Sequence, residues 1–327
     1  MKIAVVLPCF RVARHLEAVV SGLPARIDRI LVVDDACPEG SGDLAQALAS
    51  RDARVEVIRH AVNRGVGAAT VTGYRRALEL GCEIVVKMDG DGQMDPDRLP
   101  DLLEPVLSGR VDYAKGNRFK HVAALRTMPR LRLFGNSLLS FLVKAASGQW
   151  SVMDPTNGFT AIHARALETI ALDRLSPRYF FECDLLIALG TAGLPVEDVA
   201  MPARYGAEDS SLRIGQVLAE FPPLLLHRFF QRILVRYFVA DFTVVSLYLL
   251  LGLPMLGWGI GWGLTEWTES VRSGVTRSAG TVMVAALPTL LGFQLLLQAV
   301  AQDIRNTPQP RRGLVSDPRD VAFRMPD

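Results

Sequence analysis

Hydrophobic residues in the first two thirds of the chain form two alternating patterns. Short runs rich in valine and isoleucine, which are typical of buried parallel strands, occur at residues 3–8, 30–35, 55–60 and 83–89. Longer segments with helical periodicity occur near residues 14–23, 42–51, 67–80 and 97–107. Because strands and helices alternate, the pattern predicts an open α/β sheet with helices on both faces.

The last third of the chain contains two long stretches without charged residues. Residues 242–265 would reach ~36 Å as a helix, more than the roughly 30 Å hydrocarbon core of a bilayer. Residues 278–302 form a second such stretch, and the loop between them is too short for a domain. Two buried helices of a soluble domain are the alternative, but no amphipathic segments follow that could cover them. The pattern therefore predicts a transmembrane hairpin.

An amphipathic segment precedes the hairpin and predicts a helix that lies along the lipid headgroups. Arginines flank both outer ends of the hairpin, so the positive-inside rule places both ends in the cytoplasm. The residues before Pro8 are too few for the apolar core of a signal peptide, so we expect the preceding domain in the cytoplasm too. The apolar face of the segment comprises Leu226, Phe229, Phe230, Ile233, Leu234 and Tyr237, and the flanking arginines are Arg228, Arg232, Arg236, Arg305, Arg311 and Arg312.

Composition and the spacing of glycines indicate which binding partners to expect. The formal charge of +2 is small and the arginines are scattered, so we do not expect nucleic acid as a partner. The four cysteines are isolated, which indicates thiols in a reducing compartment rather than a zinc site or a disulfide framework. The pairs Gly257 with Gly261 and Gly259 with Gly263 have GxxxG spacing, which indicates either a homo-oligomer through the transmembrane helices or incidental glycines.

An acidic segment, KMDGDGQMDPD at residues 87–97, closes the fourth predicted strand. Ligands of open α/β sheets bind at the carboxyl ends of the strands, and two carboxylates there can converge on a hard cation such as Mg²⁺ or Mn²⁺. An acidic turn that caps the next helix is the alternative. Asp95, before Pro96, fits that role, but Asp89 and Asp91 come too early for it. We therefore predict a metal site at Asp89 and Asp91.

Four motifs in this order, VVLPCF, LVVDDACPEGSGD, NRGVGAATVTG and MDGDGQMDP, resemble those of the family 2 glycosyltransferases. The resemblance points to the membrane-anchored group that includes dolichyl-phosphate mannose synthase and bacterial undecaprenyl-phosphate glycosyltransferases. It implies a GT-A-like open mixed sheet that binds a nucleotide sugar. The glycine-rich motif alone is weak evidence, since a strand-to-helix turn with small residues for close packing explains it equally well.

The resemblance also implies roles for donor-site residues. Pro8 and Phe10 would border the nucleotide base, and Asp34 or Asp35 would contact the base or ribose. Asp89, Asp91 and Gln93 would hold a divalent metal, Mg²⁺ or Mn²⁺, that bridges the diphosphate. The remaining donor-binding residues would be Val33, Asn63, Gly65 and Gly90. Because Arg11 and Val12 replace the Asn-Glu of many relatives, the nucleotide and the sugar stay open.

Motifs further along the chain resemble the family's acceptor side. YAKGNRF, DPTNGFTAI and ARYGAEDSSLR contain Arg118, Asp154, Arg204 and Arg213, which, with Asp91, the resemblance implies as catalytic or phosphate-binding residues. Glu182 and Asp184 resemble the acidic helix under the family's active site. The alternatives are solvated arginines, a turn cap at Asp154 and ordinary ion pairs of Glu182 and Asp184.

These observations predict a metal-dependent, inverting glycosyltransferase of the inner membrane, multi-pass, with a cytoplasmic catalytic domain. Its substrates would be a nucleotide sugar and a polyprenyl phosphate. The alternatives are transfer to a lipid hydroxyl or a growing glycan, or a non-catalytic membrane-anchored nucleotide-sugar binder. We expect a donor half at residues 1–115 and an acceptor half at residues 116–215. An interfacial helix (216–237), a transmembrane hairpin (238–302) and a cytoplasmic tail (303–327) would follow.

Overall fold

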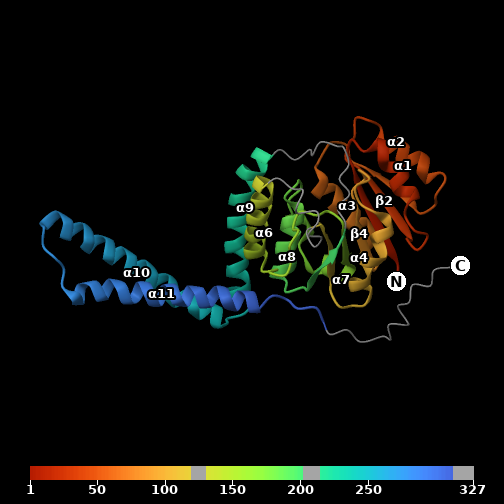
Figure 1. The fold of residues 1–327 in the computed structure, drawn as a ribbon. Coiled ribbons are helices and arrows are strands. Elements are labelled where there is room, and N and C mark those ends of the chain that lie inside the picture. The colour runs from red at the N-terminus through yellow and green to blue at the C-terminus, as the bar shows by residue number, and fades with distance from the viewer. Residues whose placement is uncertain (119–129, 202–213, 312–327) are drawn as a thin grey trace. The chain divides into compact units, whose positions relative to one another are not determined.

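The computed structural model describes residues 1–118, 130–201 and 214–311 (Figure 1). The chain divides into two compact units. The first unit comprises Met1–Phe229 and Pro308–Asp327, and the second comprises Phe230–Thr307.

The first unit is built on a seven-stranded mixed sheet with the order β3-β2-β1-β4-β6-β5-β7. The four predicted strands form its parallel half, which confirms the predicted open sheet. The strands are β1 (Ile3–Cys9), β2 (Arg29–Asp34), β3 (Val55–Arg59), β4 (Ile84–Lys87), β5 (Tyr113–Asn117), β6 (Thr160–His163) and β7 (Val196–Ala200).

Helices cover both faces of this sheet, as the alternating pattern predicted (Figure 1). On β1, Ala4 and Val6 pack with α3, α6 and α8 on one face, while Val5 and Leu7 pack with α1, α2 and α4 on the other. The period of two along the strand therefore builds two separate cores. The helices are α1 (Ala13–Ser21), α2 (Ser41–Ala49), α3 (Val66–Glu79), α4 (Leu99–Leu107), α6 (Arg130–Ser147), α7 (Ala164–Thr169) and α8 (Phe181–Thr191), with short turns η1 (Pro96–Arg98) and η3 (Leu172–Arg174).

Strand β6 joins β5 and β7 to the parallel half of the sheet. It pairs antiparallel with β4, with Thr160 opposite Lys87 and His163 opposite Ile84. Because the strands run in opposite directions, the segment that enters β6 lies at the carboxyl end of β4. This register brings Gly158 next to Lys87 and Asp89 of the acidic motif, which comes much earlier in the chain.

Helix α9 (Ile214–Leu234) continues as a π-helix, η4 (Val235–Val239). Leu226, Phe230 and Leu234 form an exposed stripe at a spacing of four residues, as predicted for the apolar face. The other residues expected on the apolar face, Phe229, Ile233 and Tyr237, are instead partly or fully buried and pack against protein. On the polar side of the helix, Arg228 pairs with Asp184 in the first unit, whereas Gln231 is exposed.

The second unit contains two helices long and apolar enough to cross a membrane, α10 (Val244–Ser273) and α11 (Ala279–Arg305), with mean hydropathies of 1.7 and 1.8. They pack against each other closely: a Cβ on Gly259 would lie 2.3 Å from Thr289 Oγ1. By contrast, a Cβ on Gly257 or Gly261 would meet no described atom within 4 Å. Gly259, from the predicted pair Gly259 and Gly263, thus contacts α11 within the hairpin. The homo-oligomer stays a prediction.

Three polar side chains form a buried cluster in this unit. The Arg232 guanidinium donates to both carboxylate oxygens of Asp303, at 2.8 and 3.0 Å, and the Tyr237 hydroxyl donates to Asp303 at 2.5 Å. Arg232 is only 1% exposed. Bidentate geometry with a third hydrogen bond is what a charged pair needs when it is removed from water.

The segment after the hairpin returns to the sheet of the first unit. Arg311 donates from its backbone amide to the Arg110 carbonyl at 2.7 Å and from its guanidinium to Asp112 at 2.6 Å. Asp112 is fully buried and also accepts from Arg165. Burial raises the pKa of Asp112, but the hydrogen bonds from Arg311 and Arg165 outweigh it and lower the pKa overall.

We therefore expect Asp112→Asn to lower the thermal midpoint at pH 7. A carboxyl group whose pKa is lowered by folding stabilises the protein above its unfolded pKa of about 3.9, and this contribution is lost as pH falls through the folded pKa. Thermal unfolding at pH 7 should show a loss of roughly 2–10 °C, which shrinks toward pH 3. Asp101→Asn, in an exposed pair with Arg98, is the control and should change little. An Asp112→Asn loss that does not depend on pH would contradict the assignment.

Candidate active site

Strands β1, β2 and β4 are parallel neighbours, so their carboxyl ends meet at one edge of the sheet. Phe10 follows β1, Asp34 ends β2 and Asp35 follows it, and Asp89 and Asp91 follow β4. Sequence positions far apart in the chain are thereby brought to a single edge. This edge is the candidate active site.

Asp35 holds the glycine-rich segment in place. Its Oδ1 accepts from the Arg64 amide at 2.9 Å and contacts His60 Nδ1 at 2.7 Å, and its Oδ2 accepts from the Gly65 amide at 2.7 Å. Asn63 donates to the Asp35 carbonyl at 3.3 Å. Both carboxylate oxygens are therefore engaged within the protein. This arrangement gives Asp35 the role of orienting the loop that opens α3.

The other expected donor residues differ in exposure. Asp34 is nearly buried, and its Oδ1 accepts from the Cys37 amide at 3.0 Å. Val33 lies in the core, and Pro8 is a buried strand residue opposite it. Phe10 is 41% exposed, with the Arg11 guanidinium 5.4 Å from its ring centroid. Of these residues, Phe10 presents the largest open surface to a ligand.

The glycines of the NRGVGAATVTG segment meet close neighbours. Gly65 has φ of +97°, a conformation that side chains rarely adopt, and a Cβ on Gly67 would lie 2.3 Å from the Ser176 carbonyl. A Cβ on Gly73 would lie 2.3 Å from Val6 on β1. Close packing of α3 against the sheet and the 176–178 segment thus explains these glycines. A dinucleotide-type loop is not needed to explain them.

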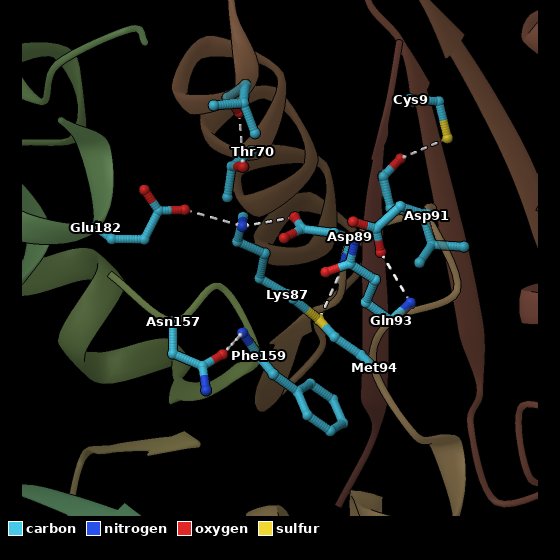
Figure 2. A network of polar contacts seen from close by, with 12 residues as sticks. Cys9, Thr70, Lys87, Asp89, Asp91, Gln93, Met94, Asn157, Phe159 and Glu182 are labelled. Carbon is cyan, nitrogen blue, oxygen red and sulfur yellow. Dashed lines mark hydrogen bonds and ion pairs between the residues drawn. The ribbon is translucent and has the colours of Figure 1, made fainter. Parts of the chain in front are cut away.

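A buried ammonium group lies directly beneath the acidic motif. Lys87, the last residue of β4, is 1% exposed, and its Nζ lies 2.7 Å from Asp89 Oδ1 and 3.0 Å from Glu182 Oε1 (Figure 2). Burial by itself would lower the pKa of Lys87, but the adjacent carboxylates of Asp89 and Glu182 raise it overall. The side chain is therefore a cation held between two anions.

Asp91 and Gln93 lie further out along the same turn (Figure 2). Asp91 Oδ1 accepts from the Gln93 amide at 3.0 Å, so the backbone orients the second carboxylate of the motif. Asp95 accepts from the Asp97 amide at 3.2 Å and caps η1, which confirms its predicted capping role. Gly90 packs closely against Val12: a Cβ added at Gly90 would lie 3.0 Å from Val12 Cγ2.

The residues present fit a hard divalent cation by the chemistry of their donor atoms. Asp89, Asp91 and Gln93 offer carboxylate and amide oxygens from one turn, and these are the ligands that Mg²⁺ and Mn²⁺ prefer. Within the described part of the chain, no group of three or more His, Cys, Asp or Glu side chains forms a ready-made cage. A metal there needs further ligands from water or from a bound diphosphate, as is usual for Mg²⁺ sites.

Gly158 packs directly against this motif. A Cβ on Gly158, in the predicted DPTNGF segment, would lie 2.5 Å from Lys87 Nζ and 2.6 Å from Asp89 Oδ2. Lys115, a second fully buried lysine, donates to the Asn157 carbonyl on the other side of Gly158. Burial lowers the pKa of Lys115. Two buried lysines therefore support the segment that precedes β6.

Arg118 and Asp154 are brought together as an ion pair. The Arg118 guanidinium donates to both oxygens of Asp154, at 2.8 and 3.0 Å, and Asp154 is fully buried. Asp154 thus orients Arg118, whose side chain is 38% exposed. Glu182 and Asp184 each form an ion pair with a different residue. Glu182 binds Lys87, whereas Asp184 binds Arg228. Arg204 and Arg213 lie outside the described residues.

Sequence reasoning missed three buried charged residues in this region, Lys87, Lys115 and Asp198. Asp198 Oδ2 accepts from Asn117 and from the Met153 amide, each at 2.7 Å, and burial raises the pKa of Asp198. Each of the three lies within a strand. A charged residue inside an apolar strand run is a signal that could have identified them.

Comparison with known proteins identifies the class. The family described as "Glycosyl transferase family 2" matches residues 4–171. The chain belongs to glycosyl transferase family 2, which confirms the predicted enzyme class.

Several curated relatives act on polyprenyl phosphates by name. An undecaprenyl-phosphate mannosyltransferase of Micrococcus luteus is 30% identical over 202 residues, which cover 61% of this chain and 82% of the relative. A polyprenol monophosphomannose synthase of Mycolicibacterium smegmatis is 32% identical and covers 60% and 74%. A UDP-N-acetylglucosamine–dolichyl-phosphate N-acetylglucosaminyltransferase of Methanococcus voltae is 28% identical and covers 67% and 92%.

Solved structures share the fold. Glucosyl-3-phosphoglycerate synthase from Mycobacterium tuberculosis, crystallised with UDP, is 20% identical with a TM-score of 0.52, and the match covers 71% of this chain and 79% of that chain. Another structure of the same synthase contains Mn²⁺ and UDP-glucose, with a TM-score of 0.53 and coverage of 69% and 78%. The predicted GT-A-like architecture is thereby confirmed.

Gly158→Ala should impair sugar transfer, because its methyl group would displace Lys87 Nζ and Asp89 Oδ2. We expect turnover to fall by about ten-fold or more, the usual cost of disturbing groups that orient a site. Gly135→Ala is the control, since a Cβ there meets no described atom within 4 Å. Initial rates of nucleotide release in both variants measure the effect. Equal rates would show that the close approach at Gly158 has no functional consequence.

Proposed function

We propose that this family 2 glycosyltransferase moves a sugar from a nucleotide sugar to a polyprenyl phosphate, with inversion and with a divalent metal. The observation that carries the proposal is the edge where β1, β2 and β4 end, with Asp89 and Asp91 beside the strand ends that would seat a nucleotide. The names of the curated relatives support the acceptor class.

The donor would lie along this edge. Phe10 offers an exposed ring to a base, and Asp34, Asn63 and the loop held by Asp35 border the same strand ends. Asp89, Asp91 and Gln93 would hold Mg²⁺ or Mn²⁺, and Mn²⁺ is present in a structure of the same fold. When bound, the metal would neutralise the charge of the diphosphate leaving group.

The acceptor phosphate would be met by arginines. Arg118 is oriented by Asp154 and keeps part of its side chain exposed, while Arg204 and Arg213 are proposed from the sequence alone. A phosphate monoester with a second pKa of about 6 is largely ionised at pH 7, so it can attack without a general base. Cations are needed instead, because two anionic substrates meet in one site.

The chain would be anchored by α10 and α11 as a multi-pass protein of the inner membrane, with the catalytic unit in the cytoplasm. Two apolar helices and the exposed stripe of Leu226, Phe230 and Leu234 support this placement. The proposed division into donor half, acceptor half, interfacial helix, hairpin and tail follows the boundaries expected from the sequence. A lipid-embedded acceptor explains why a soluble type of catalytic fold carries such a hairpin.

The acceptor class can be tested with the purified full-length chain in detergent. Radiolabelled nucleotide sugars, with Mn²⁺, are offered with undecaprenyl phosphate or with undecaprenol, which differ only in the phosphate. We expect label in the lipid phase with the phosphate and at least ~100-fold less with the alcohol, because a hydroxyl lacks the ionised oxygen and needs a base. Equal transfer to undecaprenol would contradict the proposal and favour the hydroxyl alternative. Donor binding without transfer to either lipid would favour the non-catalytic binder.

A further inference from the structure

Lys87 occupies an unusual position for a lysine, since its side chain is almost fully buried at the end of a central strand. Its ammonium contacts Asp89 on one side and Glu182 on the other. Glu182 comes from the first turn of α8, nearly a hundred residues later in the chain. The ammonium thus links the metal motif to a helix of the opposite half of the domain (Figure 2).

The contact with Asp89 selects one oxygen of the carboxylate. Lys87 Nζ lies 2.7 Å from Oδ1, whereas Oδ2 is the oxygen that approaches the Cβ position of Gly158. The Asp89 amide donates to Met94 Sδ at 3.2 Å, so the backbone of this residue is fixed as well. With Oδ1 bound to the ammonium, Oδ2 packed against Gly158 and the backbone amide bonded to Met94, rotation of the Asp89 carboxylate is restricted.

Burial explains why this arrangement is rigid. A charged group removed from water is strongly destabilised unless it stays paired, so Lys87 cannot leave its two carboxylates without a large cost. Gly158 closes the space above the ammonium, and Thr160 pairs with Lys87 in the β4–β6 register. The surrounding backbone therefore holds the ammonium where Asp89 needs it.

We propose that Lys87 is a positioning residue, which Glu182 holds in place and which orients the Asp89 carboxylate for binding of the divalent metal and the donor diphosphate. The proposal rests on the proposed function for the presence of metal and diphosphate. It assigns Glu182 a role through Lys87 rather than a direct contact with substrate.

The test separates orientation from charge. Lys87→Met alone would leave Glu182 as an unpaired buried carboxylate, so it would disturb the fold. The double variant Lys87→Met/Glu182→Gln removes one positive and one negative charge, keeps the net charge and leaves Asp89, whose side chain is 32% exposed, as the remaining carboxylate. Binding of Mn²⁺ is followed by electron paramagnetic resonance in the presence of UDP, with GDP in a parallel series, and thermal unfolding reports the fold.

We expect the double variant to keep a thermal midpoint close to that of the wild type and to need about ten-fold or more Mn²⁺ for half-saturation, the usual effect of losing a group that orients a metal ligand. In an Asp89→Asn background the same pair of substitutions should cause no further loss, because Lys87 acts through Asp89. The double variant Arg54→Met/Asp52→Asn is the matched control: it also removes one cation and one anion, but this pair lies between α2 and β3, away from the acidic motif, so the half-saturation should stay within about two-fold.

The outcomes distinguish this proposal from the proposed function. If the wild type binds Mn²⁺ and transfers sugar while the folded double variant has wild-type half-saturation, Lys87 has no positioning role. A further loss in the Asp89→Asn background would also overturn it, because Lys87 would then act by another route. If the wild type binds Mn²⁺ but transfers no sugar to undecaprenyl phosphate, the proposed function fails, and the half-saturation of the variants still decides the role of Lys87.

Discussion

The buried contact of the Lys87 ammonium with Asp89 and Glu182 is the interaction on which the architecture of the site depends. A lone ammonium at this depth would be strongly destabilised, and removing one partner of a buried ion pair typically costs about 3–5 kcal/mol. One carboxylate follows β4 and the other comes from α8, so satisfying one buried charge requires both elements to be in place. The fold and the geometry of the acidic motif are therefore coupled.

Strand directions create this meeting point. Parallel strands β1, β2 and β4 deliver their carboxyl ends to one edge, and antiparallel β6 brings the Gly158 segment to the same edge from the opposite direction. The parallel half could be predicted from the sequence, because each strand is an apolar run and the acidic motif follows the last of them. The cap at Asp95 was predictable for a similar reason, since capping is a local interaction between neighbours in sequence.

Long-range polar pairing could not be predicted in the same way. Strand β6 has only four residues, and nothing local indicates that it inserts between β4 and β5. The pairs of Lys87 with Glu182 and of Arg232 with Asp303 join residues 95 and 71 positions apart. Charge counting used Arg228 and Arg232 only as positive charges that flank the hairpin, and it gave no sign that both pair with aspartates within the protein. Periodicity reports which face of an element is apolar, but the partner of a buried charge depends on the tertiary fold.

The central claim is that the acidic turn after β4 binds a metal together with a nucleoside diphosphate. The most direct measurement is anomalous scattering at the manganese edge, from crystals of the full-length protein grown with Mn²⁺ and UDP or GDP. The account predicts one anomalous peak within about 2.5 Å of an oxygen of Asp91, next to the diphosphate, with Lys87 still bonded to Asp89. A bound diphosphate whose manganese peak lies away from Asp89, Asp91 and Gln93, or that has no such peak, would contradict it.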